Sequence, residues 1–150
     1  MKQIVTAIIV AGLALSLAPA AASASDQFHP DVEYALDTVP GGIALSDTEV
    51  LWPALGMRLE AEIGSARAVG SCATGTYCAF SGSNLGGTRL SFTVCTNVST
   101  AALQNVGSIA NGRSSGLVRA RNSAAVVLGT ATPNGSANVG LGTTSLLCTL

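Results

Sequence analysis

Cationic side chains are scarce in this sequence. It has 150 residues, of which 10% are charged, and 7 Lys and Arg against 8 Asp and Glu leave a formal net charge of -1. A protein that binds the phosphate backbone of a nucleic acid needs a concentrated basic surface. We therefore expect no nucleic acid among its partners.

Aromatic and catalytic side chains are also few. Aromatic residues make up 4% of the chain, so the core must rest mainly on aliphatic side chains, and His29 is the single histidine. With a single histidine the sequence has no paired His and Glu motif for a catalytic metal, and its carboxylates are crowded into one segment. His29 lies in a short stretch that we interpret as a solvated tail. We therefore expect no enzymatic activity.

One apolar run stands out, and it lies at the N-terminus. Lys2 precedes an uncharged stretch from Ile4 to Leu17, Pro19 interrupts it, and Ala22-Ser23-Ala24 fits the small-x-small cleavage rule. Because about 20 apolar residues are needed to cross a bilayer, residues 1–24 are interpreted as a signal peptide and not as an anchor. We expect the mature chain to be secreted and extracellular, monomeric and without a membrane span.

The remaining chain is divided by charge at residue 63. From there to the end the sequence has five arginines and no acid, whereas Arg58 is the one cation between the signal peptide and residue 63. The acids are Asp26, Asp31, Glu33, Asp37, Asp47, Glu49, Glu60 and Glu62. One interpretation is that the acidic segment, residues 25–62, packs on the basic part and neutralises it. The other is a weakly basic face for an acidic partner such as a cell-wall polymer.

The acidic segment is expected to form a short helix and a hairpin. Residues 31–37 have acids in the first turn, which suits the helix dipole, and Pro40-Gly41-Gly42 ends the helix. We predict strands over residues 46–52 and 57–63. The second alternates apolar and charged residues, which is typical of a half-buried strand.

Residues 63–150 read as one all-β domain. Short strands are separated by turns rich in Gly, Asn and Ser, including Asn122-Ser123-Ala124 and Pro133-Asn134-Gly135-Ser136. The predicted strands are residues 76–80, 88–94, 117–121, 125–130, 137–141 and 145–149. Such regular spacing favours an antiparallel sandwich.

Four cysteines predict two disulfides in an exported chain, with three possible pairings. We choose Cys72–Cys78, which closes a small loop over Gly75, and Cys95–Cys148, which ties a central strand to the last one. Cys95 and Cys148 have no near cysteine neighbours of the kind a tetrahedral zinc site needs. The cysteines are therefore interpreted as staples for a core that is poor in aromatic residues.

The stretch from Cys72 to Gly87 resembles a βγ-crystallin Greek-key signature. In that signature an aromatic residue starts a folded hairpin, an apolar residue follows, and a glycine closes it. Phe80, Leu85 and Gly87 take these places here. Together with the flanking cysteines and the stretches at residues 108–116 and 118–122, residues 70–148 resemble the Streptomyces metalloproteinase inhibitor family. The resemblance implies a βγ-crystallin-like Greek-key sandwich over residues 63–150.

The resemblance also implies a function. Members of this family inhibit thermolysin-like metalloproteinases by offering a rigid loop to the active-site cleft. The corresponding loop here is Thr74-Gly75-Thr76-Tyr77, with Tyr77 offering an apolar body to a hydrophobic subsite. The implied partner is a secreted proteinase, with a metalloproteinase as the class that the family inhibits. The family has two small cysteine loops and this chain has one, so no reactive bond is carried over.

Calcium is a weaker implication of the same resemblance. Many crystallin-type domains hold calcium through two Asn or Asp residues followed by Ser or Thr and then Ser. Asn111 and Ser115 fit, but Ala110 replaces the first polar residue and Arg113 lies between them. We therefore expect no cofactor, with calcium as the alternative.

The leading hypothesis is a secreted, non-enzymatic proteinase inhibitor that acts through the disulfide-closed loop. The alternative is a structural or cell-surface binding module for a wall polymer or carbohydrate, in which the same disulfides serve only durability.

Overall fold

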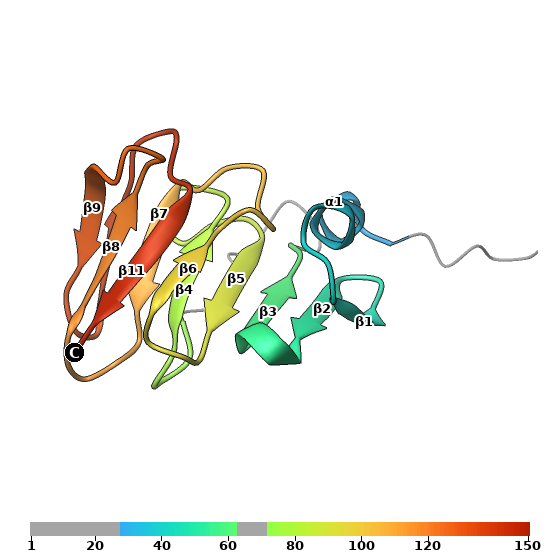
Figure 1. The fold of residues 1–150 in the computed structure, drawn as a ribbon, viewed down its shortest axis with the longest axis horizontal. Coiled ribbons are helices and arrows are strands. Elements are labelled where there is room, and N and C mark those ends of the chain that lie inside the picture. The colour runs from blue at the N-terminus through green and yellow to red at the C-terminus, as the bar shows by residue number, and fades with distance from the viewer. Residues whose placement is uncertain (1–27, 63–71) are drawn as a thin grey trace, which may run out of the picture.

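A computed structural model describes residues 28–62 and 72–150 of the chain. The expected signal peptide and the expected boundary at residue 63 lie outside these ranges. The described part forms two antiparallel sheets and one short α-helix, as Figure 1 shows, so the all-β prediction is confirmed. None of the helices in residues 28–62 and 72–150 has the length and apolar character needed to cross a membrane.

Helix α1 (Pro30–Thr38) confirms the predicted helix. His29 is its N-cap, and the Nδ1 atom of His29 accepts a hydrogen bond from the backbone N–H of Asp31 over 3.2 Å. Pro30 suits the first helical position because the N–H it lacks would have no partner there. Val32 and Ala35 are fully buried and face the rest of the molecule. The helix ends at Val39, immediately before Pro40.

The rest of the acidic segment forms β1 (Ile43–Ser46), β2 (Glu49–Trp52), a 3-10 turn (Pro53–Leu55) and β3 (Met57–Glu60). The strand predicted over residues 46–52 is confirmed for Glu49–Trp52 but is wrong at its start, where a tight turn at Asp47 and Thr48 separates β1 from β2. The Oγ atom of Ser46 accepts a hydrogen bond from the Thr48 N–H over 3.2 Å and closes the turn. The alternation in β3 is confirmed, since Met57 and Leu59 are buried and Arg58 is exposed.

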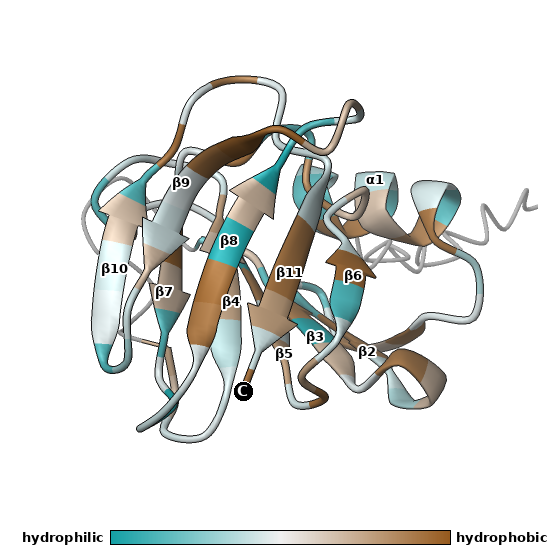
Figure 2. Cartoon of the chain, turned by 60° about the vertical axis from the view of Figure 1, so that its left-hand side comes forward, coloured by the Kyte–Doolittle hydropathy of each residue, from teal (hydrophilic) through white to brown (hydrophobic). Residues whose placement is uncertain are grey.

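Eight further strands follow between residues 77 and 149. They are β4 (Tyr77–Phe80), β5 (Arg89–Phe92), β6 (Asn97–Ser99), β7 (Ser108–Asn111), β8 (Leu117–Arg121), β9 (Val127–Ala131), β10 (Gly135–Asn138) and β11 (Ser145–Thr149). The seven-stranded sheet has the order β1-β2-β3-β5-β4-β7-β10, and the four-stranded sheet has the order β6-β11-β8-β9. Figure 2 shows the smaller sheet lying across the larger one.

The acidic segment is continuous with the larger sheet. β3 pairs with β5 in antiparallel register, with Leu59 opposite Leu90 and Met57 opposite Phe92. Thr88, which is buried, donates a hydrogen bond to the carboxylate of Asp31 on α1. The segment therefore packs on the rest of the chain by strand pairing as well as by side-chain contact.

The last eight strands exchange partners between the two sheets. β4, β5 and β7 lie in the larger sheet, whereas β6 crosses to pair with β11 in the smaller one. β8, β9 and β11 lie in the smaller sheet, whereas β10 crosses to pair with β7. Each set of four consecutive strands thus places its third strand in the other sheet.

The main core fills the space between the two sheets. The largest fully buried side chains there include Trp52, Tyr77 and Phe92, so the few aromatic residues are used in the core.

Both predicted disulfides are present. Cys95–Cys148 fastens the segment before β6 to β11, with a Cα–Cα distance of 5.0 Å. Cys72–Cys78 lies on the outer face of the larger sheet, with a Cα–Cα distance of 5.8 Å.

Candidate functional site

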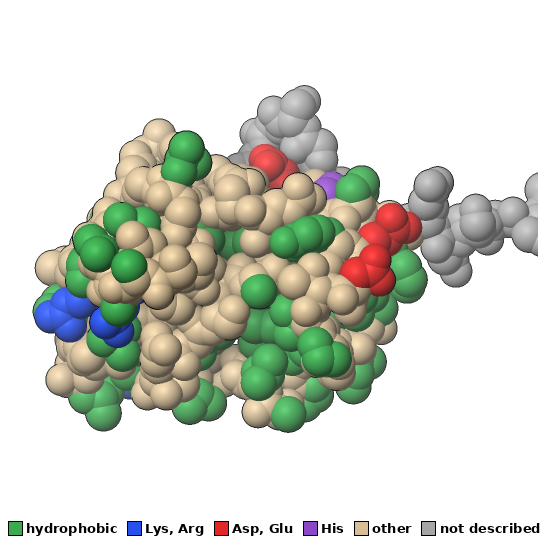
Figure 3. Space-filling view, turned by 45° about the horizontal axis from the view of Figure 1, so that its top comes forward, with side chains coloured by type: hydrophobic (Ala, Val, Ile, Leu, Met, Phe, Trp, Pro, Cys, Tyr) green, Lys and Arg blue, Asp and Glu red, His purple; other side chains and the backbone are tan. Residues whose placement is uncertain are grey.

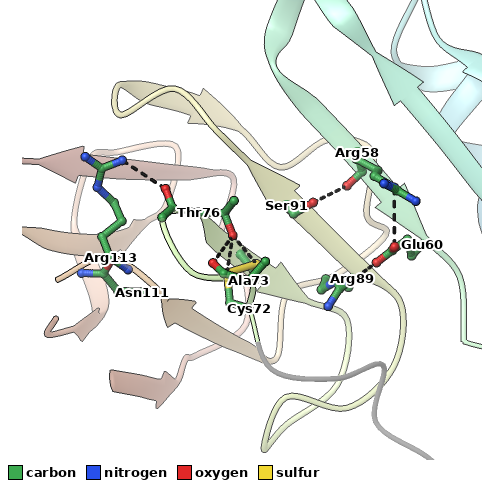
Figure 4. Close-up of a disulfide and its surroundings, with 11 residues drawn as sticks. Arg58, Glu60, Cys72, Ala73, Thr76, Arg89, Ser91, Asn111 and Arg113 are labelled. Carbon is green, nitrogen blue, oxygen red and sulfur yellow. Dashed lines mark hydrogen bonds and ion pairs between the residues drawn. A yellow bond between two sulfur atoms is a disulfide. The ribbon is translucent and has the colours of Figure 1, made fainter. Parts of the chain in front are cut away.

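The loop between Cys72 and Cys78 projects from the start of β4. Ala73, Thr74 and Gly75 are exposed, and Gly75 has a φ angle of 84°, a left-handed conformation that favours glycine. The disulfide fixes the two ends of the loop, as the close-up in Figure 4 shows. The loop therefore presents a three-residue tip above a fixed base.

Hydrogen bonds hold this tip from both sides. Within the loop, the backbone N–H and the Oγ1 hydroxyl of Thr76 both donate to the Ala73 carbonyl, over 3.0 and 2.7 Å. From outside the loop, the Gly112 carbonyl accepts from the Gly75 N–H over 2.8 Å, and the Gly112 N–H donates to the Thr76 carbonyl over 2.9 Å. Arg113 adds a bond from Nη1 to the Gly75 carbonyl over 3.3 Å, which is drawn in Figure 4.

Gly112 permits this close approach. A Cβ atom on Gly112 would lie 2.5 Å from the Ala73 carbonyl oxygen and 3.0 Å from that of Cys72, distances at which atoms must shift. No sequence signal marks this residue as part of the loop, since it is separated from Cys78 by three strands. The strand pairing of β4 with β7 brings the two segments together.

Tyr77 does not belong to the exposed tip. We expected its ring to be offered to a partner, but it is fully buried and stacks on Phe92 with ring centroids 5.2 Å apart. It opens β4, where it faces the main core, and its hydroxyl donates to the carbonyls of Val94, over 2.9 Å, or Thr96, over 3.3 Å. Burial raises the pKa of this hydroxyl above its ordinary value of 10.0, against smaller opposite effects of the Thr96 carbonyl and Arg113. Tyr77 is therefore a core residue that anchors the loop from below.

The three signature residues lie together beside the loop. Phe80 is fully buried and forms a small cluster on the outer face of the larger sheet with Cys78 and Ala110, against which Leu85 and Cys72 pack. Leu85 has a φ angle of 63°, in the left-handed region that disfavours a residue with a side chain. The apolar contact accompanies this conformation and places the hairpin over the sheet.

Two serines that the sequence analysis missed close the hairpin over this cluster. The Oγ atom of Ser81 accepts a hydrogen bond from the Thr88 N–H over 2.9 Å. The Oγ atom of Ser108 on β7 accepts from the Leu85 N–H over 2.9 Å and donates to the Gly82 carbonyl over 2.6 Å. Gly87, with a φ angle of 78°, lies where an added Cβ would collide with Ser81 Oγ. The hairpin is thus fixed to a third strand.

The residues singled out for calcium lie at the other end of β7. Asn111 is buried, its Oδ1 atom accepts from the Arg113 N–H and its Nδ2 atom donates to the Gly116 carbonyl, each over 3.2 Å. Ser115 is exposed. Within residues 28–62 and 72–150, no three His, Cys, Asp or Glu side chains gather into a metal site. The Asn111 side chain serves here to close its own loop and to position Arg113 for Gly75.

An ion-pair network links the acidic segment to β5 on the same outer face. Arg58 contacts Glu49 over 2.7 Å and Glu60 over 3.5 Å, and Glu60 also pairs with Arg89. Burial, with a smaller contribution from nearby Arg58, lowers the pKa of Arg89. We expected the acidic segment to neutralise basic residues in the rest of the chain. Among the described ion pairs, the one between Glu60 and Arg89 joins the two parts, across the strands β3 and β5.

Comparison of the chain with protein-family models, with curated proteins and with solved structures finds no match.

Proposed function

We propose that the chain is a secreted, non-enzymatic proteinase inhibitor that acts through the loop of residues 72–78. The observation that carries the proposal is the rigidity of an exposed tip: Ala73, Thr74 and Gly75 face solvent while a disulfide and hydrogen bonds from both sides fix their backbone. A loop that is already ordered loses little entropy on binding, so more of its contact energy appears as affinity. To avoid being cleaved, such a loop must also keep its folded conformation inside the active-site cleft of the proteinase.

The arrangement of the last eight strands supports the crystallin-type fold on which this proposal draws. The strands form two successive sets of four, and in each set the third strand lies in the opposite sheet. A pair of interlocked Greek keys would have this strand order. The hairpin over Phe80, with Leu85 and Gly87 at the expected places and Ser108 below it, agrees with the crystallin signature. We propose a secreted protein in accordance with the leader sequence and the two disulfides.

The proposal is tested by titrating the oxidised protein against a thermolysin-like metalloproteinase and against a subtilisin-like serine proteinase. The protein is expressed as the full sequence in an exporting host. Thr74→Asp changes the exposed tip without removing any described hydrogen bond, and Ser123→Asp places the same charge on another exposed turn as a matched control. We expect stoichiometric inhibition of the metalloproteinase by the wild type and by Ser123→Asp, and its loss in Thr74→Asp.

Two outcomes contradict the proposal. If neither proteinase is inhibited while the protein survives intact, inhibition of these classes is wrong. If Thr74→Asp inhibits as well as Ser123→Asp does, the loop is not the site. Thermal unfolding of both variants separates a local effect at the tip from a loss of the fold.

A further inference from the structure

The outer face of the four-stranded sheet carries two arginines from one strand. In β8 the side chains alternate, with Val118 and Ala120 fully buried and Arg119 and Arg121 half-buried on the opposite, outer side. Because residues two apart on a strand share a face, the two guanidinium groups emerge side by side, with their Cα atoms about 7 Å apart. Their strand, β8, is an inner strand of the sheet, between β11 and β9.

Hydroxyl, amide and aliphatic side chains surround these arginines. Arg121 lies opposite Ser145 on β11 and Val127 on β9, and Ser145 lies opposite Ser99 on β6. Arg119 lies opposite Thr130 on β9, and on its other side Leu147 of β11 stands between it and Asn97 on β6. Directly opposite residues share a face of the sheet. We define the arginine face by Asn97, Ser99, Arg119, Arg121, Thr130 and Ser145.

The acidic segment does not neutralise the arginine face. The ion pairs between acids and arginines in the described ranges involve Arg58 and Arg89. Arg121 donates from Nε to the Ala125 carbonyl over 3.1 Å, and the side chain of Arg119 makes neither a hydrogen bond nor an ion pair within residues 28–62 and 72–150. Figure 3 shows the blue side chains at the left of the visible surface and the red side chains at its top and right, away from the blue ones. From residue 63 onward the sequence also contains no acid.

We propose that the arginine face binds an acidic polysaccharide. A guanidinium group can hold a carboxylate or a phosphate by two parallel hydrogen bonds, so two adjacent arginines suit a polymer with a repeated anionic group. The hydroxyl and amide side chains on either side can exchange hydrogen bonds with sugar hydroxyls. β8 lies between β11 and β9, so the face continues on both sides of the arginines, and the lack of acids from residue 63 onward leaves the positive potential undiminished. This site is separate from the loop of residues 72–78.

Binding is measured with polygalacturonate as the probe, using affinity electrophoresis of the oxidised protein. Neutral dextran is the uncharged control, and poly-glutamate is the anionic control without sugar hydroxyls. We expect polygalacturonate to retard the wild type more than either control polymer, and added salt to weaken this binding. Arg119→Gln with Arg121→Gln is expected to lose about tenfold or more in affinity, because two charge-assisted contacts are removed.

Variants with matched charge keep the test specific. Arg58→Gln with Arg113→Gln removes two arginines elsewhere and should bind as the wild type does. Arg119→Lys with Arg121→Lys keeps the charge but loses the paired geometry, and should bind more weakly than the wild type and more tightly than the glutamine pair.

Three results overturn the proposal. If the two glutamine double variants lose equal affinity for polygalacturonate, the net charge of the protein alone controls binding. If poly-glutamate binds as tightly as polygalacturonate, the sugar hydroxyls take no part in recognition. The third result is that the protein binds no polymer but self-associates in sedimentation experiments, in a way that salt weakens and the Arg119 and Arg121 changes abolish. The arginine face would then bind the acidic end of a second copy of the chain. Because the changes at Arg119 and Arg121 leave the loop of residues 72–78 untouched, proteinase titration of these variants distinguishes the failure of this proposal from the failure of the first.

Discussion

Single residues decide the shape of the candidate loop, and Gly112 is the one with least freedom to change. Gly112→Ala would force its new methyl group against the Ala73 carbonyl, so the tip must move or β7 must yield. We expect a loss of about 1–3 kcal/mol in the free energy of unfolding, as is usual for overpacking. Urea unfolding measures this loss. Gly140→Ala, where an added Cβ meets nothing within 4 Å, is the control, and an equal effect of both changes would contradict the close contact.

Tyr77 gives the protein a pH dependence at the alkaline end. Because burial raises the pKa of its hydroxyl in the folded state, the unfolded state loses the proton first as the pH rises past about 10. The free energy of unfolding should therefore fall above that pH. Denaturant unfolding across this range measures the slope, and Tyr77→Phe should make the slope shallower. A slope unchanged in Tyr77→Phe would show that other groups control it.

At the scale of elements, the two disulfides should contribute unequally. Cys95–Cys148 spans a sequence separation of 53 and Cys72–Cys78 one of 6. On the loop-entropy model, replacing each pair with alanine costs about 4 and about 2 kcal/mol respectively. Thermal and denaturant unfolding of the two double variants measure the difference. The reverse order would mean that the small loop stabilises the fold through its contacts with Gly112 and not through chain entropy.

The elements that the sequence predicted are those with a local signal. The alternation at Met57 and Leu59, the acids in the first turn of α1, and the Asn134 turn, where φ is 54°, all depend on neighbouring residues. β1, β6 and β7 were missed. The residues of β7, Ser108–Asn111, are all buried and mostly small, so they show no alternation. β6 has only three residues, and its pairing with β11 lies far along the chain.

The candidate site was predictable only in part for the same reason. Cysteine spacing identified the loop, but local sequence could not reveal that Tyr77 faces the core, because that depends on which side of β4 packs against the smaller sheet. Ser108 and Gly112 act across the pairing of β4 with β7, and nothing near them in sequence indicates a partner.

At the scale of the whole molecule, the pairing of β3 with β5 predicts one cooperative unfolding unit. Residues from both segments form a single buried cluster, and Glu60 pairs with Arg89 across the two strands. Differential scanning calorimetry of the oxidised protein should show one transition whose calorimetric and van't Hoff enthalpies agree. Two separate transitions would show that the acidic segment folds independently.

The exchange of β6 and β10 also constrains the timing of folding. Among the described strands β6 pairs with β11 alone, through contacts such as Val98 with Leu146, so it has no described strand partner until β11 is available. Such distant contacts slow folding, since a long loop must close before any pairing energy is gained. A chain that is synthesised gradually would therefore leave β6 unpaired while the segments after it arrive. The Cys95–Cys148 bond, which joins the segment before β6 to β11, would then mark the completion of folding.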